Sequence, residues 1–122
     1  MNVLSKNVSA EQCRQIRDAQ VYPITVQTAT ASYVDFGSAV DAGNSSSIAF
    51  TLLNTHGSLT IKWKVLASID GITYVEVQAE ATVANGASGT YAVSNPPYRY
   101  YKAQIIDGSG HATATGSVIT KD

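Results

Sequence analysis

The side chains that could do chemistry are few, and none has the spacing of a known catalytic or metal site. His56 and His111 lie in predicted loop tips, and neither has a cysteine or a second histidine at a zinc-ligand spacing. Ser109 stands near a histidine, but its Gly-Ser-Gly-His loop lacks the strained turn that exposes the serine of a hydrolase. We therefore expect a protein with no catalytic activity, no essential metal and no cofactor.

Oxygen-bearing side chains are the remaining candidates for a metal site, because calcium prefers oxygen ligands. Asp35, Asp41 and Asn44 fall in residues 35–47, which we expect to form a loop. Their spacing differs from that of an EF-hand, so turn formation is the favoured interpretation and a calcium site is the alternative.

Three further reactive side chains are expected to have structural roles. Asp70 and Asp107 fall in predicted turns, which their carboxylates should stabilise. Cys13 is the single cysteine, which excludes an intrachain disulfide and a cysteine-rich zinc site. We expect it to make a small apolar contact rather than to react as a thiol.

Tyrosine is the better lead to function. The chain has seven tyrosines and two phenylalanines, a ratio that favours surface positions because tyrosine keeps one polar end in water. Tyr98, Tyr100 and Ile119 are expected to lie together on one exposed face and to form a protein interface. Ordinary strand tyrosines and a sugar-stacking platform are the alternative interpretations. The orientations of Tyr22, Tyr33 and Tyr91 stay open.

Length and charge limit the class of protein that positions these side chains. The chain has 122 residues, enough for one domain, and 44% of them are hydrophobic. Charged residues make up 14% and the net charge is −1, so we expect neither nucleic-acid binding nor a polybasic membrane anchor. No apolar run approaches the about 20 residues of a membrane span, and the first residues lack the features of a signal peptide.

Residues 1–20 predict a short arm or helix. Ser9 is a suitable N-cap, and Val8, Cys13 and Ile16 supply a narrow apolar stripe. A helix this short is marginal in water without a surface to pack on. Two interpretations stay open: a frayed terminus, and an arm that uses the stripe to order against a neighbouring subunit.

From residue 21 onward, apolar residues recur with a period of two, and turn signals recur about every eight to twelve residues. This pattern is typical of an antiparallel sandwich or barrel. We predict a single all-β domain over residues 21–122, an antiparallel β-sandwich of the jelly-roll type. The eight expected strands are residues 21–28, 32–36, 47–53, 59–67, 73–80, 89–93, 98–106 and 112–120.

Alternation also predicts three hairpins between consecutive strands, because turn length decides which inward side chains meet. The first is expected to pair Val65 with Val75, Trp63 with Val77 and Lys64 with Glu76. Gly71 in its turn is expected to adopt the left-handed backbone conformation. The second is expected to pair Leu52 with Leu59, Phe50 with Ile61 and Ile48 with Trp63. The third is expected to pair Tyr101 with Gly116, Ala103 with Ala114 and Ile105 with Ala112. Trp63 should therefore lie at the centre of the core.

Three stretches carry a resemblance to known sandwich domains. The hairpin of residues 63–75, with Ser68-Ile69-Asp70-Gly71 at its turn, resembles one found in discoidin-like, galactose-binding sandwiches. Pro97-Tyr98-Arg99-Tyr100-Tyr101-Lys102-Ala103 looks like a later strand of such domains. Residues 48–120 as a whole resemble small structural proteins of tailed bacteriophages. Such proteins repeat the same hairpin and finish with a strand like Gly110-His111-Ala112-Thr113-Ala114-Thr115. The resemblance implies the fold type and a virion setting, and it transfers no binding residue.

On this resemblance we expect a phage virion structural protein, a capsid decoration or cement protein that stabilises the head through protein contacts. Its expected partners are the major capsid protein or other virion proteins, on the capsid surface, after a period in the host cytoplasm during assembly. Multivalent binding favours a homo-oligomer, with a trimer ahead of a dimer. The alternatives are a carbohydrate-binding sandwich module and a neck, tail or fibre protein of the virion.

Overall fold

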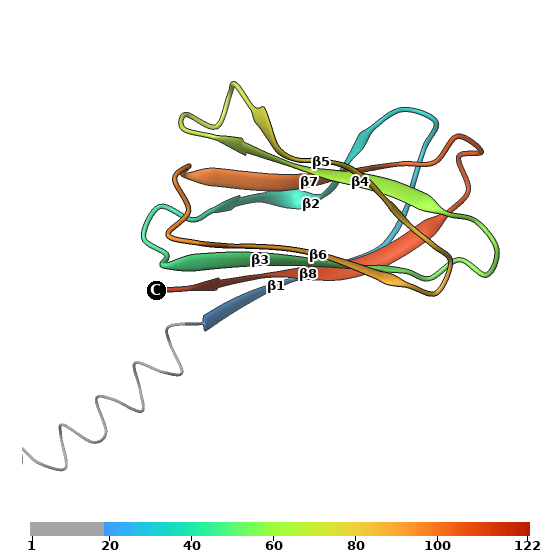
Figure 1. Cartoon of the computed structure of the whole chain (residues 1–122), viewed down its shortest axis with the longest axis horizontal. Helices are drawn as coiled ribbons and strands as arrows, with labels where there is room; N and C mark the ends of the chain where they lie inside the picture. The colour runs from blue at the N-terminus through green and yellow to red at the C-terminus, as the bar shows by residue number, and fades with distance from the viewer. Residues whose placement is uncertain (1–18) are drawn as a thin grey trace, which may run out of the picture.

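The computed structural model describes residues 19–122, which form eight strands (Figure 1). Val8, Cys13 and Ile16, the predicted contacts of the arm, lie outside the described residues, so the arm stays a prediction. The described residues include no helix long and apolar enough to cross a membrane. The strands are β1 (Ala19–Thr28), β2 (Val34–Asp41), β3 (Ser47–Asn54), β4 (Ile61–Ser68), β5 (Val75–Val83), β6 (Ser88–Ser94), β7 (Tyr100–Ile106) and β8 (Thr113–Lys121).

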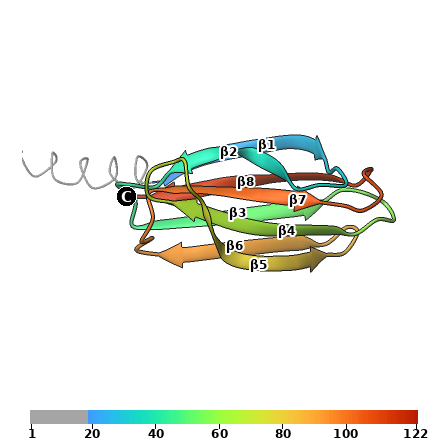
Figure 2. The same cartoon turned by 90° about the horizontal axis from the view of Figure 1, so that it is seen from above.

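The strands form two four-stranded antiparallel sheets that pack face to face, as Figures 1 and 2 show. The strand order is β1-β8-β3-β6 in one sheet and β2-β7-β4-β5 in the other. Among these eight strands, only β4 and β5 are both consecutive in the sequence and neighbours in a sheet. Every other step along the described chain crosses the sandwich. This is a jelly-roll topology, and the predicted all-β sandwich of about eight strands is confirmed.

The core lies between the sheets and is built from alternate residues of each strand. In β4, Trp63 and Val65 are buried between the sheets while Lys62 is exposed. Trp63 is 2% exposed, which confirms its predicted place in the core. The predicted inward residues of β3 and β7 are buried in the same way: Ile48, Phe50, Leu52, Tyr101, Ala103 and Ile105.

Two of the three predicted hairpins are wrong. β3 and β4 belong to different sheets, and so do β7 and β8. Leu52 pairs with Gly89 and Gly116 rather than with Leu59, and Tyr101 pairs with strands β2 and β4 rather than with β8. Alternation predicts which side chains point inward, but the pairing partners depend on where the chain crosses between the sheets.

The first of the three predicted hairpins, between β4 and β5, exists, but its register is wrong. Val65 lies opposite Gln78 and Trp63 opposite Ala81, because the connecting loop is longer than predicted and the register shifts on both sides of Val65. These irregularities disturb the alternation along β5. Val75, expected to point into the core, is exposed as a result.

β2 extends through a stretch that was predicted to be a loop. Asp35 lies inside this strand, which continues across a bulge to Asp41. The predicted loop over residues 35–47 is therefore wrong, and so is the grouping of Asp35 with Asn44 around it. Among residues 19–122, no three His, Cys, Asp or Glu side chains gather closely enough to hold a metal ion.

Candidate functional site

The predicted interface residues Tyr98, Tyr100 and Ile119 do not share one face. Tyr100 points outward from the β2-β7-β4-β5 sheet, whereas Ile119 points outward from the opposite sheet. Tyr98 precedes β7 and packs half-buried against the core, with its ring edge-on to Tyr101 at 6.3 Å between centroids. The predicted grouping is wrong because it assumed that β7 and β8 form a hairpin.

A cluster of exposed apolar side chains lies instead at one end of the sandwich, on the β4–β5 loop at the upper left of Figure 1. Ile69 is 73% exposed, Ile72 is 83% exposed, and Val75 is also exposed. Ile69, Val75 and Tyr98 line a shallow hollow of about 240 Å³. We call Ile69, Ile72, Val75 and Tyr98 the apolar tip. Grouped exposed apolar side chains are typical of interaction surfaces.

Three of the four residues of the apolar tip are not predicted to be surface contacts. Ile69 is predicted in a tight turn and Val75 in the core, and Ile72 has no predicted role. A signal was present, because Asp70-Gly71 is a strong turn pair. Apolar residues on either side of such a turn project from the end of a hairpin and do not reach the core between the sheets.

Hydrogen bonds around Asp70 hold the backbone of the apolar tip. Its Oδ1 accepts from the amides of Ile72 at 2.8 Å and Thr73 at 3.0 Å, and from the Ser68 hydroxyl at 2.9 Å. The Ser68 hydroxyl oxygen accepts from the Gly71 amide at 2.9 Å. Since Ser68 is buried at the end of β4, the loop is anchored to the sheet. The predicted structural role of Asp70 is confirmed, and these bonds order the backbone of the apolar tip.

Gly71 lets this loop lie directly against Tyr100. Its φ is 79°, a conformation that favours glycine, as predicted. A Cβ at this position would lie 3.3 Å from Cε2 of Tyr100. The Arg99 guanidinium carbon lies 5.1 Å from the centroid of the same ring, in a cation–π contact. Tyr100 therefore supports the apolar tip rather than forming part of an exposed cluster.

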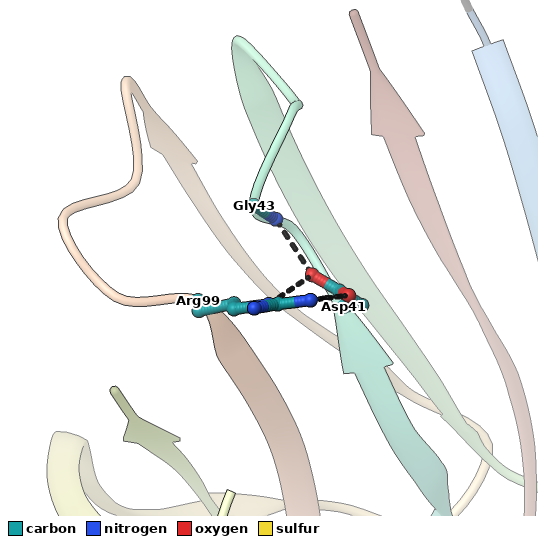
Figure 3. Close-up of polar contacts among 3 residues, drawn as sticks. All are labelled: Asp41, Gly43 and Arg99. Carbon is teal, nitrogen blue, oxygen red and sulfur yellow. Dashed lines mark hydrogen bonds and ion pairs between the residues drawn. The ribbon is translucent and has the colours of Figure 1, made fainter. Parts of the chain in front are cut away.

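Arg99 is held in turn by Asp41 (Figure 3). The guanidinium Nη2 donates to Oδ2 at 3.1 Å, and Nε lies 3.3 Å from both carboxylate oxygens. Asp41 Oδ1 also accepts from the Gly43 amide at 2.9 Å. These hydrogen bonds, that of Arg99 above all, lower the pKa of Asp41. The contacts join three loops at this end of the sandwich into one supported surface.

The bonds to Asp70 predict an acid-dependent loss of stability. The amides of Thr73 and Ile72, followed by the Ser68 hydroxyl, lower the pKa of Asp70 from its ordinary 3.8 to about 2. Ionised Asp70 therefore stabilises the folded state above about pH 4, and this contribution is lost as the pH falls toward 2. We expect Asp70→Asn to melt below the wild type at pH 6, and the gap to narrow between pH 4 and pH 2. Thermal unfolding followed by circular dichroism measures the gap, and a pH-independent gap would contradict this role.

The outward face of the β2-β7-β4-β5 sheet pairs its charges internally. Lys64 lies 3.7 Å from Glu76, so the predicted ion pair is confirmed although the register is not. Lys102 lies 3.3 Å from Asp35. Each of these lysines also covers a tyrosine ring, which leaves less ring surface for a sugar to stack on. The cation–π pairs are Lys64 with Tyr33 at 4.1 Å and Lys102 with Tyr74 at 4.4 Å.

The two histidine loops at the opposite end are held by local bonds. His56 Nδ1 accepts from two loop amides at 3.1 Å each. Asp107 accepts from the Ser109 hydroxyl at 2.6 Å and from the amides of His111 and Ala112 at 3.2 and 3.0 Å. These bonds, led by that of Ser109, lower the pKa of Asp107 to about 2. The predicted turn-stabilising role of Asp107 is confirmed.

The fold defines the class of protein: a β-sandwich with jelly-roll topology. No family model and no curated protein matches the chain. Solved structures do match it. That of Bacillus endospore appendages, described as disulfide-linked pili, is 19% identical over 84% of this chain and 85% of that chain, with a TM-score of 0.55.

Two further solved structures are also similar to the chain. The SPBc2 prophage-derived protein YomS is 12% identical over 84% of this chain and 93% of that chain, with a TM-score of 0.56. The PBSX exported protein XepA is 13% identical over 84% of this chain, with a TM-score of 0.61, and only 36% of XepA is covered. At these identities the likeness shows a shared fold.

Proposed function

We propose that the protein is a virion structural protein of a tailed phage, a capsid decoration or cement protein. The observation that carries the proposal is the apolar tip, in which the exposed side chains of Ile69, Ile72 and Val75 lie beside half-buried Tyr98 on an ordered backbone. Burying such side chains on a partner gains binding free energy at a small ordering cost. The fold likeness to the prophage-derived protein YomS supports the phage setting.

The proposed partners are the major capsid protein or other virion proteins, met at the capsid surface after assembly in the host cytoplasm. Ile69 and Ile72 would anchor the contact, with Val75 and Tyr98 around them. The role is binding rather than catalysis: each bound copy adds buried area to the shell and so opposes the pressure of packaged DNA. Many copies on one capsid make even a modest contact effective.

Capsid binding tests this proposal. We expect the double variant Ile69→Asp, Ile72→Asp to bind purified capsids that lack the protein at least about tenfold more weakly than the wild type, the effect of losing one binding hot spot. Both side chains are exposed, so the variant should fold normally. Leu53→Asp is the matched control. Leu53 is also an exposed apolar residue, but it lies at the end of β3 that leads into the His56 loop, away from the apolar tip. Cosedimentation measures the affinity, and equal binding by all three proteins would contradict the proposed contact.

A neck, tail or fibre position is the second candidate. It is favoured by the fold likeness to the endospore appendage structure, described as a pilus, of which 85% is covered. Copies of the chain would then contact one another along a filament. Immunogold labelling of particles separates the two positions, since label over the head favours a decoration protein and label over the tail favours this candidate.

The carbohydrate-binding alternative has less support, because cations already cover the rings of Tyr33, Tyr74 and Tyr100. Binding of the wild type to a glycan array that is lost on Tyr33→Ala would favour it over the capsid proposal.

A further inference from the structure

A groove runs along one side of the sandwich between β1 and β2, the edge strands of the two sheets. Figure 2 shows these two strands on the same side of the molecule. The groove has a volume of about 630 Å³. Edge strands present unpaired backbone groups, and proteins commonly cover them with another segment.

Apolar groups supply a little more than half of the exposed lining of the groove, which is open to solvent. Ile24 and Val118, both buried, belong to its lining. Val21 is 59% exposed and Val26 is 64% exposed, and Tyr22 is also exposed. Several exposed apolar side chains on one edge strand are typical of a surface that another segment covers.

The charged and amide side chains of the lining are already engaged. Gln27 of β1 donates through Nε2 to the carbonyl oxygen of Asp35 and accepts through Oε1 from the Gly37 amide at 3.2 Å. These two hydrogen bonds connect β1 to β2 beside its bulge. Asp41, at the other end of the lining, is bound to Arg99. An occupant would therefore bind mainly through apolar side chains.

We propose that the groove binds residues 1–18 of a second copy of this chain. These residues directly precede β1, which forms one wall of the groove. They carry the apolar stripe of Val8, Cys13 and Ile16. Eighteen residues can extend about 60 Å, enough to reach a neighbouring molecule.

Two observations favour a second copy over the chain's own groove. β1 is already a paired strand from Ala19, which lies opposite Lys121, so a segment returning to its own groove must reverse direction before residue 19. Residues 14–18, which directly precede β1, contain no glycine, proline, asparagine or serine, and Asp18 is the one residue among them that favours such a reversal. Reaching the groove of a neighbour needs no tight turn.

Charge is consistent with this contact. Residues 1–18 contain three basic and two acidic side chains, a net charge of +1. The whole chain has a net charge of −1, so residues 19–122 carry −2. The segment and the domain that would receive it therefore attract each other weakly.

The exchange gives a specific route to the expected homo-oligomer. Reciprocal exchange between two copies closes a dimer, and head-to-tail exchange around a ring closes a trimer. This inference concerns self-association and is separate from the proposed capsid contact of the apolar tip. The two can fail independently, because they use different surfaces.

Paramagnetic relaxation in a mixed sample of full-length chains tests the proposal. One copy is wild type with a nitroxide on Cys13, the single cysteine; the observed copy is ¹⁵N-labelled and carries Cys13→Ser. We expect the amide signals of residues 21–27 and 37–41 to lose at least about half of their intensity, and to recover when the nitroxide is reduced. Loss elsewhere, or no loss, would overturn the proposal.

A dilution sample separates the two possible sources of the segment. Here the nitroxide is on the ¹⁵N-labelled wild type, diluted tenfold with unlabelled Cys13→Ser chain. Residues 21–27 follow Cys13 closely in the sequence, so the nitroxide of the same chain broadens them in this sample and they are not scored. Broadening of residues 37–41 should largely disappear. Broadening that persists would mean that each chain fills its own groove, and would overturn the assignment to a second copy.

Light scattering of full-length variants tests the same contact by mass. We expect the wild type to have two or three times the chain mass of 12.9 kDa, and Val26→Glu to fall to a single chain. Leu53→Glu is the control, because Leu53 is an exposed apolar residue that lies neither in the groove nor in the apolar tip, and it should keep the wild-type mass. A monomeric wild type, or a Val26→Glu variant of unchanged mass, would overturn the proposal.

Discussion

Trp63→Ala is expected to lower the free energy of unfolding by about 3–5 kcal/mol, the usual cost of removing a large aromatic side chain from a core. Trp63 is buried between the sheets, and it lies so close to β6 that a Cβ added at Gly89 would be 3.0 Å from its Nε1. Its removal leaves a cavity that the two sheets cannot fill without moving.

Urea unfolding followed by far-ultraviolet circular dichroism measures this loss in both proteins. The matched control is Leu53→Ala, at an exposed apolar position, which should cost less than about 1 kcal/mol. The wild-type indole emission should also be that of a buried tryptophan. Emission typical of a fully hydrated indole would contradict the described core.

Gly116→Ala is expected to be the second most damaging substitution. A Cβ at this position of β8 would lie 2.2 Å from the backbone oxygen of Thr51 and 3.0 Å from Cε2 of Phe36. Overpacking a core costs about 1–3 kcal/mol and occasionally more. We expect the upper part of this range, because the nearest obstacle is the backbone of β3, an inner strand of the sheet.

Gly57→Ala is the control for this substitution, because no atom lies within 4 Å of an added Cβ there. It should change the unfolding free energy by less than about 0.5 kcal/mol. Equal unfolding midpoints for the two variants would show that β8 and β3 do not approach as closely as described.

The inward-facing residues could be predicted from the sequence because they depend on a local property. Successive side chains of a strand point to opposite faces, so apolar residues at every second position define the core side. This holds for Trp63 and Val65 in β4 and for Phe50 and Leu52 in β3. It breaks down in β5, where register shifts beside Val65 disturb the alternation.

The pairing of the strands could not be predicted in the same way. Hairpin rules assume that consecutive strands are neighbours, and in this jelly roll only β4 and β5 meet that condition among the described strands. The turns before β4 and before β8 contain ordinary turn residues, so nothing local distinguishes a hairpin from a crossing between sheets. The choice is made by the packing of the whole domain.

The candidate site was missed for a related reason. The predicted grouping of Tyr100 with Ile119 assumed that β7 and β8 form a hairpin. These strands belong to different sheets, so the two residues lie on opposite faces of the sandwich. The apolar tip could be predicted only with the true length of the β4–β5 loop. That loop runs from the end of β4 at Ser68 to the start of β5 at Val75, so Ile72 lies outside both strands. The role of Asp70 as a turn residue was predictable, because its carboxylate acts on amides two and three residues away.

Cryo-electron microscopy of purified phage particles, with mass spectrometry to confirm that the chain is present, tests the central claim most directly. The account predicts many copies of an eight-stranded sandwich on the outer surface of the head, each with Ile69 and Ile72 against the capsid shell. Absence of the chain from the particles, or sandwiches whose β4–β5 loops point into solvent, would contradict it.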